Sequence, residues 1–384
     1  MRSYRDLFRT PEFGPLFLGS AVQTAAGTIG GLAVGTLVYR ATQSPLLAAV
    51  GMFGPSLAQV LGATFLMSGA DRLPPRATLT GVSLAFAAGT AVLALPGLPV
   101  GAVFAVLFAQ GLVASLGGGV RWGLLTEILA KDGYLLGRSV FGMASGLTQI
   151  AGFGAGGVLI AVLAPRPALL LAALLHAAAA ITVRLGLTRR PPRATGRPSV
   201  AATWRSNALL WSSRPRRRVY LLLWLPNGLV VGAESLYVSY APDTAGLLFA
   251  CGALGLLAGN VTVGRLVPPG RRARLGGPLL VLLAAPYLVF FLRPALPVAA
   301  VLVTVASAGF GASLVHQERL VALTPDDLSG HALGLHSAGM LTLQGLSATL
   351  AGTVAQLTSA ATAMTAMASA SLAVTAWLTL TPRR

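Results

Sequence analysis

The stretch "MSGADRLPPRATL" (residues 67–79) is a short polar break between two long apolar runs. It places Asp71, Arg72 and Arg76 around two prolines, in a chain in which only 10% of the residues are charged. A second stretch, "TVGRLVPPGRRARL" (262–275), repeats the pattern of arginine, paired prolines and further arginines. A helix needs about 20 apolar residues to cross a bilayer, and the flanking runs approach this length. We therefore interpret both stretches as turns between membrane-spanning helices.

The composition supports a membrane protein. Of the 384 residues 55% are hydrophobic, and the mean hydropathy is +0.75, whereas a soluble domain carries roughly 25% charged residues. The net charge of +18 does not indicate nucleic-acid binding, because the arginines lie between apolar runs and not on a basic domain. The single Cys251 predicts neither a disulfide framework nor a cysteine metal site. We see no cleavable signal peptide, because the first apolar run is too long for one.

Twelve spanning helices are expected, with boundaries uncertain by several residues. Strict alternation of apolar and polar residues is missing, which excludes a β-barrel and leaves helices as the spanning elements. The predicted spans are 15–38, 45–68, 77–95, 99–120, 138–163, 167–187, 219–240, 244–266, 275–292, 296–315, 331–356 and 360–380.

The distribution of basic residues predicts the orientation. If both termini are cytoplasmic, the outer loops contain only Arg40, Arg166 and Arg293, and the other 25 of the 28 basic residues lie on or near the cytoplasmic side. Because cytoplasmic loops carry an excess of Lys and Arg, we predict a multi-pass plasma-membrane protein with both termini inside.

The longest polar segment, 189–218, divides the spans into an N-terminal bundle (1–188) and a C-terminal bundle (219–384). Its middle carries apolar residues among Arg and Ser, which suits a short amphipathic helix on the inner leaflet. A disordered cytoplasmic linker is the alternative.

The two halves share landmarks that indicate an internal repeat. Three glycines of span five lie opposite three glycines of span eleven at one offset of 193 residues: Gly137, Gly146 and Gly152, and Gly330, Gly339 and Gly345. A basic, proline-containing turn follows the second span of each half. The same positions recurring in both halves favour duplication.

Two six-span halves, a cytoplasmic linker and a basic turn after the second span of each half resemble the major facilitator superfamily of secondary transporters. Asp71, Arg72 and Arg76 match the loop signature of that family, whereas Met67, Pro74 and Pro75 depart from it and Gly264 replaces the acid in the second half. The resemblance implies an all-α integral membrane fold of twelve helices in two pseudo-symmetric six-helix bundles.

The segments "FRTPEFGPLFLGSAVQTAAG" (8–27) and "TQIAGFGAGGVL" (148–159) look similar to bacterial twelve-span exporters of the macrolide-efflux type. Gln110 and Gly111 keep part of an exporter motif, but Leu107 stands where that motif has an Arg. The resemblance implies a monomer that uses no cofactor and moves a small, drug-like molecule out of the cell by alternating access, coupled to protons.

Polar groups at membrane depth are costly and therefore candidate sites. The amides of Gln23, Gln110, Gln149 and Asn227 fall near the middle of spans one, four, five and seven. The resemblance implies that spans one, four and seven line a central cavity, so the amides on these spans predict a polar patch there with Gln149 beside it. Interhelical hydrogen bonds are the alternative. We interpret His176 in span six as structural.

Glu234 is the one acid well inside an apolar span. Counted at about 1.5 Å per residue from residue 219, it lies in the outer half of the membrane. A carboxylate there must pair with a cation, face water or take up a proton. We therefore predict that Glu234 carries the coupling proton or binds a cationic part of the substrate, with Tyr237 and Tyr240 close to it.

Charges at the inner ends of the spans predict a cytoplasmic gate. The resemblance implies that Asp71 clasps the start of span eleven, and the arginines around it are either gate residues or topological anchors. Two further charge pairs predict salt-bridged gating in each half: Arg121 with Glu127, and Glu318 with Arg319.

Two other classes of protein compete with a transporter. A polytopic membrane enzyme is disfavoured because the four histidines form no pair at metal-binding spacing, "HQER" (316–319) is not HExxH, and no nucleophile elbow is present. A sensor or scaffold that binds a ligand without moving it is the second alternative.

Overall fold

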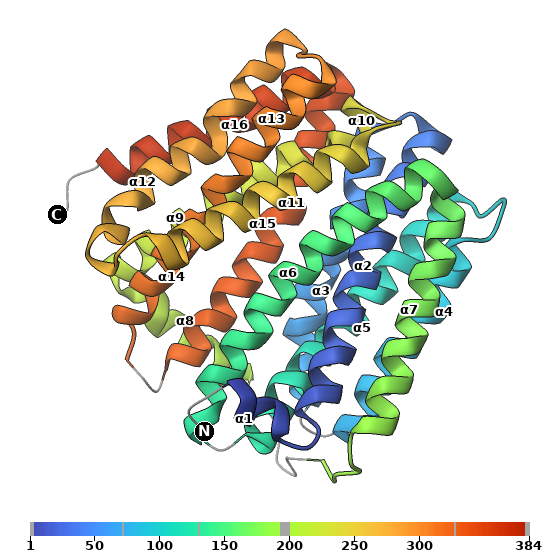
Figure 1. Cartoon of the computed structure of the whole chain (residues 1–384), viewed down its shortest axis with the longest axis vertical. Coiled ribbons are helices and arrows are strands. Elements are labelled where there is room, and N and C mark those ends of the chain that lie inside the picture. Colours follow the sequence, from blue (N-terminus) through green and yellow to red (C-terminus); the bar gives the residue numbers. More distant parts are fainter. Residues whose placement is uncertain (1–3, 71–72, 130, 193–199, 326–327, 381–384) are drawn as a thin grey trace. The chain divides into compact units, whose positions relative to one another are not determined.

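The computed structural model of the chain (Figure 1) describes residues 4–70, 73–129, 131–192, 200–325 and 328–380. Every regular element among these residues is helical. Contacts divide the chain into two compact units, Met1–Leu37 with Leu57–Pro198, and Val38–Ser56 with Ser199–Arg384. The second unit therefore includes the end of one helix, the start of the next and the turn that joins them.

The helices that make up most of the first unit are long and apolar. Proline in the first turn starts several of them, at positions where a missing backbone N–H costs no hydrogen bond. In order they are α1 (Tyr4–Arg9), α2 (Phe13–Thr42), α3 (Pro45–Ala70), α4 (Pro75–Leu93), α5 (Val100–Ile128), α6 (Lys131–Leu163) and α7 (Pro165–Gly186).

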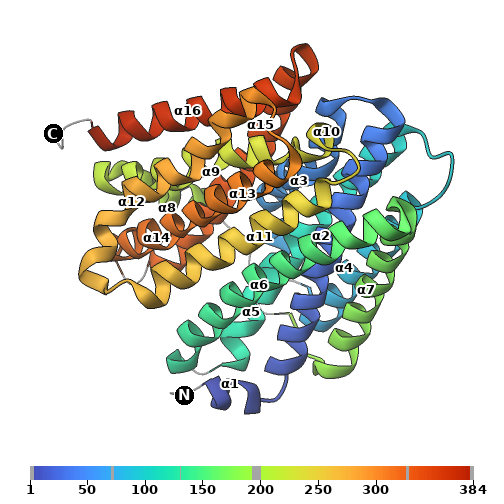
Figure 2. The same cartoon turned by 45° about the horizontal axis from the view of Figure 1, so that its top comes forward.

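Within the first unit, α4 and α7 pack along much of their length (Figures 1 and 2). Gly152 and Gly156 of α6 lie against Thr28 and Ile29 of α2, where a Cβ would fall 2.9 Å and 3.3 Å from the nearest atoms. Small residues at four-residue spacing allow backbones to approach closely in lipid, where no hydrophobic force acts between helices. This glycine pair therefore lets α6 pack closely against α2.

The second unit contains shorter helical segments that follow one another without long loops. In order they are α8 (Val200–Ser212), α9 (Arg214–Glu234), α10 (Tyr237–Tyr240), α11 (Ala245–Val261), the π-helix η1 (Thr262–Leu266), α12 (Pro269–Ala284), the 3-10 helix η2 (Ala285–Leu292), α13 (Leu296–Ala308), the 3-10 turn η3 (Gly309–Gly311), α14 (Ala312–Ala322), α15 (Ser329–Leu357) and α16 (Ala360–Leu380).

Close packing in the second unit centres on glycines of α11. A Cβ on Gly255 would collide with the backbone carbonyl oxygen of Thr304 in α13, and one on Gly259 would collide with that of Ala308. Helix α9 is held in the same manner, since a Cβ on Gly228 would lie 2.7 Å from Leu343 of α15. These contacts place α11 directly beside α13, and α9 directly beside α15.

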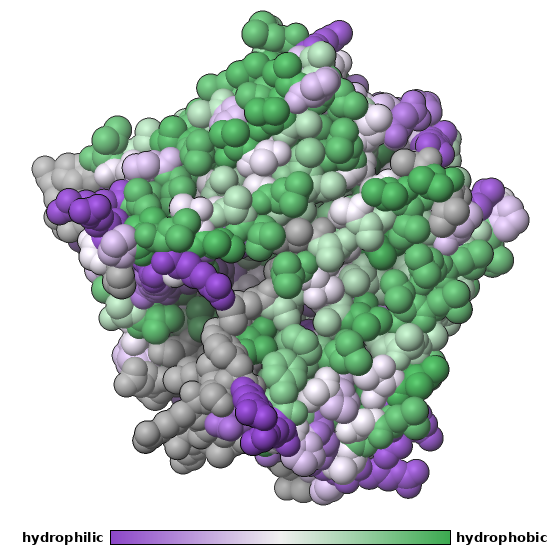
Figure 3. All heavy atoms as spheres, in the orientation of Figure 1, coloured by the Kyte–Doolittle hydropathy of each residue, from purple (hydrophilic) through white to green (hydrophobic). Residues whose placement is uncertain are grey.

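Among the described residues, ten helices or consecutive helical runs are long and apolar enough to cross a membrane. Figure 3 shows apolar side chains over the helices and hydrophilic ones gathered toward their ends, and the chain is a multi-pass membrane protein. Two long helices, α6 and α15, are outside these ten, so the count of twelve spans stays a prediction. Several helices are longer than predicted, notably α5, which continues to Ile128.

Helix α8 lies within the segment where the linker was expected to form a short helix or to be disordered. Leu210 is fully buried, and the Trp211 ring stacks on Trp224 of α9 at 5.6 Å. The Nη2 group of Arg216 donates to the Leu209 carbonyl over 2.9 Å. This part of the apolar face of α8 is therefore covered by α9 and not by lipid.

Candidate functional site

Glu234 is the last residue of α9, directly before a break in the helix. Ser235 and Leu236 form the break, and the Ser235 hydroxyl donates to the Gly232 carbonyl over 2.7 Å. The chain then continues as the short helix α10, which begins at Tyr237. The break keeps the partly buried Glu234 carboxyl and the Tyr237 ring close together.

The groups that act on the Glu234 carboxyl are hydroxyls. Tyr287 of η2 and Ser307 of α13 both lie within reach of it. The Tyr287 and Tyr237 hydroxyls form a hydrogen bond with each other, and both rings are only 1% exposed. The Ser307 side chain is also buried, at 1% exposed, and its hydroxyl lies beside both the Glu234 carboxyl and the Tyr287 hydroxyl. We name Glu234, Tyr237, Tyr287 and Ser307 the acid cluster.

The acid cluster contains no counter-charge. Among the described residues, no Arg, Lys or His forms an ion pair with Glu234. An ionised carboxylate out of water is costly unless it is paired, and neutral hydroxyl donors offset only part of that cost. The arrangement therefore suits a carboxyl group that exchanges a proton.

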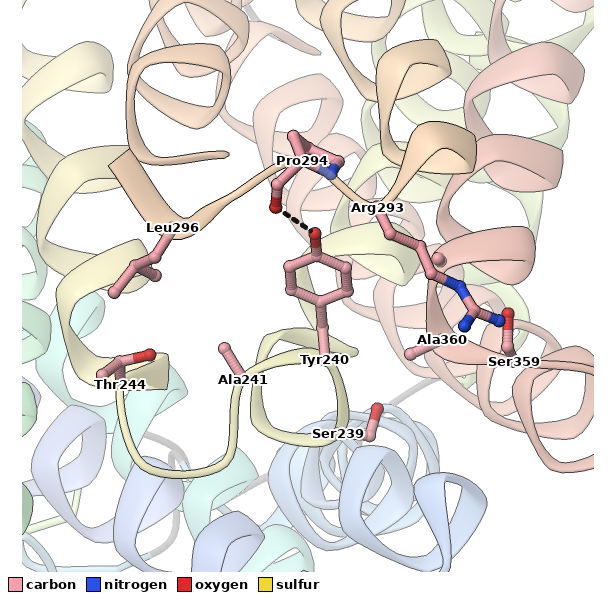
Figure 4. A pocket seen from close by; sticks show the side chains of 10 residues that line it. Ser239, Tyr240, Ala241, Thr244, Arg293, Pro294, Leu296, Ser359 and Ala360 are labelled. Carbon is pink, nitrogen blue, oxygen red and sulfur yellow. Dashed lines mark hydrogen bonds between the residues drawn. The ribbon is translucent and has the colours of Figure 1, made fainter. Parts of the chain in front are cut away.

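A pocket of about 490 Å³ opens at the ends of the helices next to this cluster (Figure 4). The Tyr240 hydroxyl donates to the Pro294 carbonyl over 2.9 Å, and Arg293 has a left-handed backbone with φ of 51°. The Tyr240 ring packs on Phe290 at 5.2 Å, and Phe290 packs on Tyr287 at 5.4 Å. A continuous column of rings thus joins the pocket wall to the acid cluster.

Sequence reasoning missed Tyr287 and Ser307 and expected Tyr240 beside Glu234. Tyr240 instead bonds to Pro294. The sequence does contain a feature that could have pointed to Tyr287. This residue directly follows Pro286 and is the only tyrosine in the apolar run 279–292. Proline breaks the helical bonding there, and η2 takes a 3-10 geometry that changes which residues face α9.

Three of the four predicted cavity amides bond within the protein. The Gln23 Oε1 atom lies 3.0 Å from His176 Nδ1 of α7. Gln110 Nε2 donates to the Phe86 carbonyl and the Thr90 hydroxyl of α4, each over 3.2 Å. Asn227 is 1% exposed, and its Nδ2 donates to the Leu223 carbonyl one turn earlier over 2.6 Å. Gln149 alone of the four is exposed.

Helix α9 contains a proline one residue before Asn227. Pro226 has no backbone N–H, so the normal hydrogen bond to the Leu222 carbonyl is missing. The Pro226 carbonyl itself accepts from the Ser371 hydroxyl of α16 over 3.1 Å. A polar contact with a neighbouring helix therefore supports α9 next to its proline.

The predicted gate residues fall into two groups. Asp71 and Arg72 lie outside the described residues. Arg76 is half-buried in the first turn of α4, and the Arg121 guanidinium lies 5.8 Å from the ring centre of Trp122. Arg319 is in the last turn of α14.

The acids of the predicted gate pairs contact arginines other than those expected. Glu127 lies 3.8 Å from Arg190, which also pairs with Glu12 at 3.1 Å. Glu318 pairs with Arg272 at 3.1 Å, in the turn that repeats the opening sequence motif. Arg272 lies in the first turn of α12 and Arg190 follows α7, so both arginines are distant in sequence from the acids they contact. Whether these contacts act as a gate stays a prediction.

Among the described residues, no three His, Cys, Asp or Glu side chains gather in a way that could hold a metal ion.

No protein-family model and no curated protein matches the sequence. Solved structures do match it over nearly the whole chain. A POT family transporter in complex with 5-aminolevulinic acid is 12% identical, with a TM-score of 0.75 and coverage of 96% of each chain. The fold is that of the major facilitator superfamily.

Two further transporters give the same result. A bacterial homolog of the human lysosomal transporter Spinster is 13% identical, with a TM-score of 0.69 and coverage of 99% of this chain and 96% of that one. The human organic anion transporter MFSD10 (TETRAN) is 20% identical, with a TM-score of 0.66 and coverage of 95% and 98%. At these identities the likeness establishes the transporter fold, and the fold expected from the sequence is confirmed.

Proposed function

We propose that this chain is a secondary active transporter that moves a small organic molecule across the plasma membrane by alternating access. The fold supports this proposal, since transporters of peptides, nucleosides and organic anions share it. The observation that carries it further is the acid cluster, a carboxyl group inside the helices that is surrounded by hydroxyls. We propose that Glu234 takes up and releases the coupling proton.

The chemistry of the cluster suits such a cycle. A protonated Glu234 is neutral and can donate its proton in a hydrogen bond to a neighbouring hydroxyl oxygen. An ionised Glu234 accepts hydrogen bonds from the Tyr287 and Ser307 hydroxyls, which stabilise the charge in part. A change of conformation that lets water reach the carboxyl would favour proton release. Coupling then requires only that the two conformations differ in this exposure.

The substrate class follows from the polar groups that remain. Gln23, Gln110 and Asn227 already bond to other parts of the protein, so charged or strongly polar groups for a substrate are few among the described interior residues. We propose a moderately hydrophobic or amphipathic molecule, neutral or cationic, in place of a polyanion. The proposal that it is exported rests on the resemblance of the span-one and span-five segments to macrolide-type exporters.

Flux measurements in proteoliposomes test the function. Purified protein is reconstituted with an imposed pH gradient, and a panel of amphipathic organic dyes is followed across the membrane. We expect the wild-type protein to accumulate at least one dye against its gradient, and Glu234→Gln to lose this accumulation while keeping exchange of dye between equal pools.

A matched control uses another acid of the same unit. The Asp243 side chain is 92% exposed and lies 3.8 Å from Arg40, so Asp243→Asn removes a charge without touching the acid cluster. We expect this variant to pump normally. Accumulation by Glu234→Gln equal to wild type would remove the coupling role. Dye binding without any flux in the wild-type protein would identify a sensor in place of a transporter.

A further inference from the structure

A second pocket, of about 520 Å³, lies in the first unit and is lined by arginines. Arg76 and Ala77 come from the first turn of α4, and Arg184 comes from the last turn of α7. Arg189 and Arg190 come from the segment that follows α7. Four guanidinium groups therefore surround one hollow, where two packed helices end.

The charge of this arginine pocket is not neutralised by the described residues. Arg190 pairs with Glu12 and Glu127, and Glu12 Oε1 also accepts from the Thr188 hydroxyl over 2.9 Å. Among the described residues, Arg76, Arg184 and Arg189 form no ion pair. In the part of the chain that the structure describes, the pocket thus holds three positive charges close together with no acid beside them, an arrangement that favours binding of an anion.

The start of α4 adds to this preference for an anion. Its N-cap residue is Pro74, which has no side chain that can cap the first backbone N–H groups. The N–H groups of Arg76 and Ala77 belong to this first turn, and both residues line the pocket. A helix N-terminus with uncapped N–H groups carries a partial positive charge and binds phosphate well.

An apolar surface continues from the pocket along α7. Leu170, Leu174, Ile181 and Leu185 are 51%, 67%, 59% and 80% exposed, and their spacing places them on one helical face. Figure 3 shows apolar side chains along α7 and hydrophilic ones at its lower end. A free phosphate ion makes no apolar contacts with such a surface, whereas the acyl chain of a lipid would cover it.

We propose that the arginine pocket binds an anionic phospholipid, with its phosphate among Arg76, Arg184 and Arg189 and an acyl chain along the exposed face of α7. Basic pockets between spanning helices on the cytoplasmic side are known to take such headgroups. The predicted orientation places this pocket on the cytoplasmic side, where anionic lipids give the leaflet its negative surface potential. The site is separate from the acid cluster, which belongs to the second unit.

The second unit contains an equal number of arginines that can serve as a control, because they do not line the arginine pocket. Arg272 is held by the Val267 and Gly264 carbonyls at 2.9 Å and 2.7 Å and by Glu318 at 3.1 Å. Its neighbours Arg271 and Arg274, with Arg265, can be replaced together without altering the pocket in the first unit. The triple variant Arg265→Gln/Arg271→Gln/Arg274→Gln therefore controls for the loss of three positive charges.

Native mass spectrometry of the full chain, released from nanodiscs of mixed phosphatidylglycerol and phosphatidylcholine, tests the proposal. We expect one phosphatidylglycerol to stay bound to the wild-type protein and to the control triple variant. Arg76→Gln/Arg184→Gln/Arg189→Gln should bind it roughly a hundredfold more weakly, since each arginine near the surface contributes a factor of about five. Equal retention by both triple variants would overturn the proposal.

Two further measurements distinguish a lipid from a soluble phosphate ligand and guard against a variant that fails to fold. Glycerol phosphate offered in solution carries the same anionic group without acyl chains, and we expect it to bind far more weakly than the lipid. Binding of glycerol phosphate as tightly as of lipid would overturn the lipid assignment in favour of a soluble phosphate ligand. Should the triple variant fail to fold, single Arg184→Gln and Arg189→Gln, both at exposed positions, must each weaken lipid retention several-fold, and no weakening would overturn the proposal.

Discussion

The polar groups singled out in the two units differ in kind. In the first unit the amides of Gln23 and Gln110 are neutral and paired, with His176 and with Thr90. In the second unit a carboxyl group lies among the hydroxyls of Tyr287 and Ser307. Paired neutral groups hold helices together, whereas a carboxyl without a cation can change its charge. We therefore propose that the first set serves as scaffold and that the second set carries the proton chemistry.

The largest expected effect comes from separating the helices that form the acid cluster. A Cβ on Gly255 would collide with the Thr304 carbonyl oxygen and lie 3.0 Å from the Ser307 Cβ. Gly255→Ala should therefore push α13 away, lower the stability by about 1–3 kcal/mol and abolish accumulation of substrate. Thermal unfolding in detergent and dye flux measure the two effects.

Gly277→Ala is the control for this substitution. A Cβ there would have only the Thr379 side chain near it, at 3.9 Å, so we expect normal stability and flux. If Gly255→Ala pumps as well as this control, the position of Ser307 has no bearing on transport. The proposed functional group then consists of Glu234 and the two tyrosines alone.

A smaller effect is expected from removing one hydroxyl of the cluster. Tyr287→Phe keeps the buried ring but takes away a donor to the Glu234 carboxyl. A hydrogen bond to a charged group contributes about 1.5–3 kcal/mol, so the rate of uphill transport should fall roughly ten- to a hundredfold. Because the lost donor stabilises the ionised form, the remaining activity should shift toward higher pH.

Tyr240→Phe provides the comparison for Tyr287→Phe. It removes a hydroxyl that bonds to Pro294 at the pocket rim, and we expect an unchanged pH profile. A pH–rate profile of both variants distinguishes a positioning role from loss of packing. Equal profiles for both variants and the wild type would show that Tyr287 serves the fold alone.

Much of this arrangement can be predicted from sequence, because the dominant signals in a membrane chain are local. Lengths of apolar runs locate α16 at its observed bounds, Ala360–Leu380, and the position of Glu234 in an apolar run singles it out. Its neighbours cannot be predicted in this way. Tyr287 and Ser307 come from other helices, and the breaks at Ser235 and Pro286 turn the faces of α10 and η2 away from regular α-helical spacing.

The predicted cavity amides also show how far a prediction from sequence can reach. Depth in the membrane can be counted along a helix, but the direction of a side chain around the helix axis depends on packing. Gln110 falls near the middle of its span as expected, yet it points to α4 and bonds to Phe86 and Thr90. An amide at the right depth is therefore a weak indicator of a cavity until its neighbours are known.

The smallest expected effect concerns Gln110 and Gln149, and it sharpens the comparison within the first unit. Both of the Gln110 hydrogen bonds are long, at 3.2 Å each, and both join α5 to α4. Interhelical hydrogen bonds in membranes contribute about 0.6 kcal/mol on average, so Gln110→Leu should lower the unfolding temperature slightly and leave substrate affinity unchanged.

Gln149→Leu should give the reverse result if Gln149 faces the cavity. Its side chain is exposed, so the substitution should leave stability unchanged and alter the concentration of dye needed for half-maximal flux several-fold. Measuring unfolding temperature and this concentration for both variants assigns each amide to the scaffold or to the substrate path. If Gln110→Leu changes affinity and Gln149→Leu does not, the first unit contributes to recognition through a helix-packing residue, and its neutral polar groups can no longer be treated as scaffold alone.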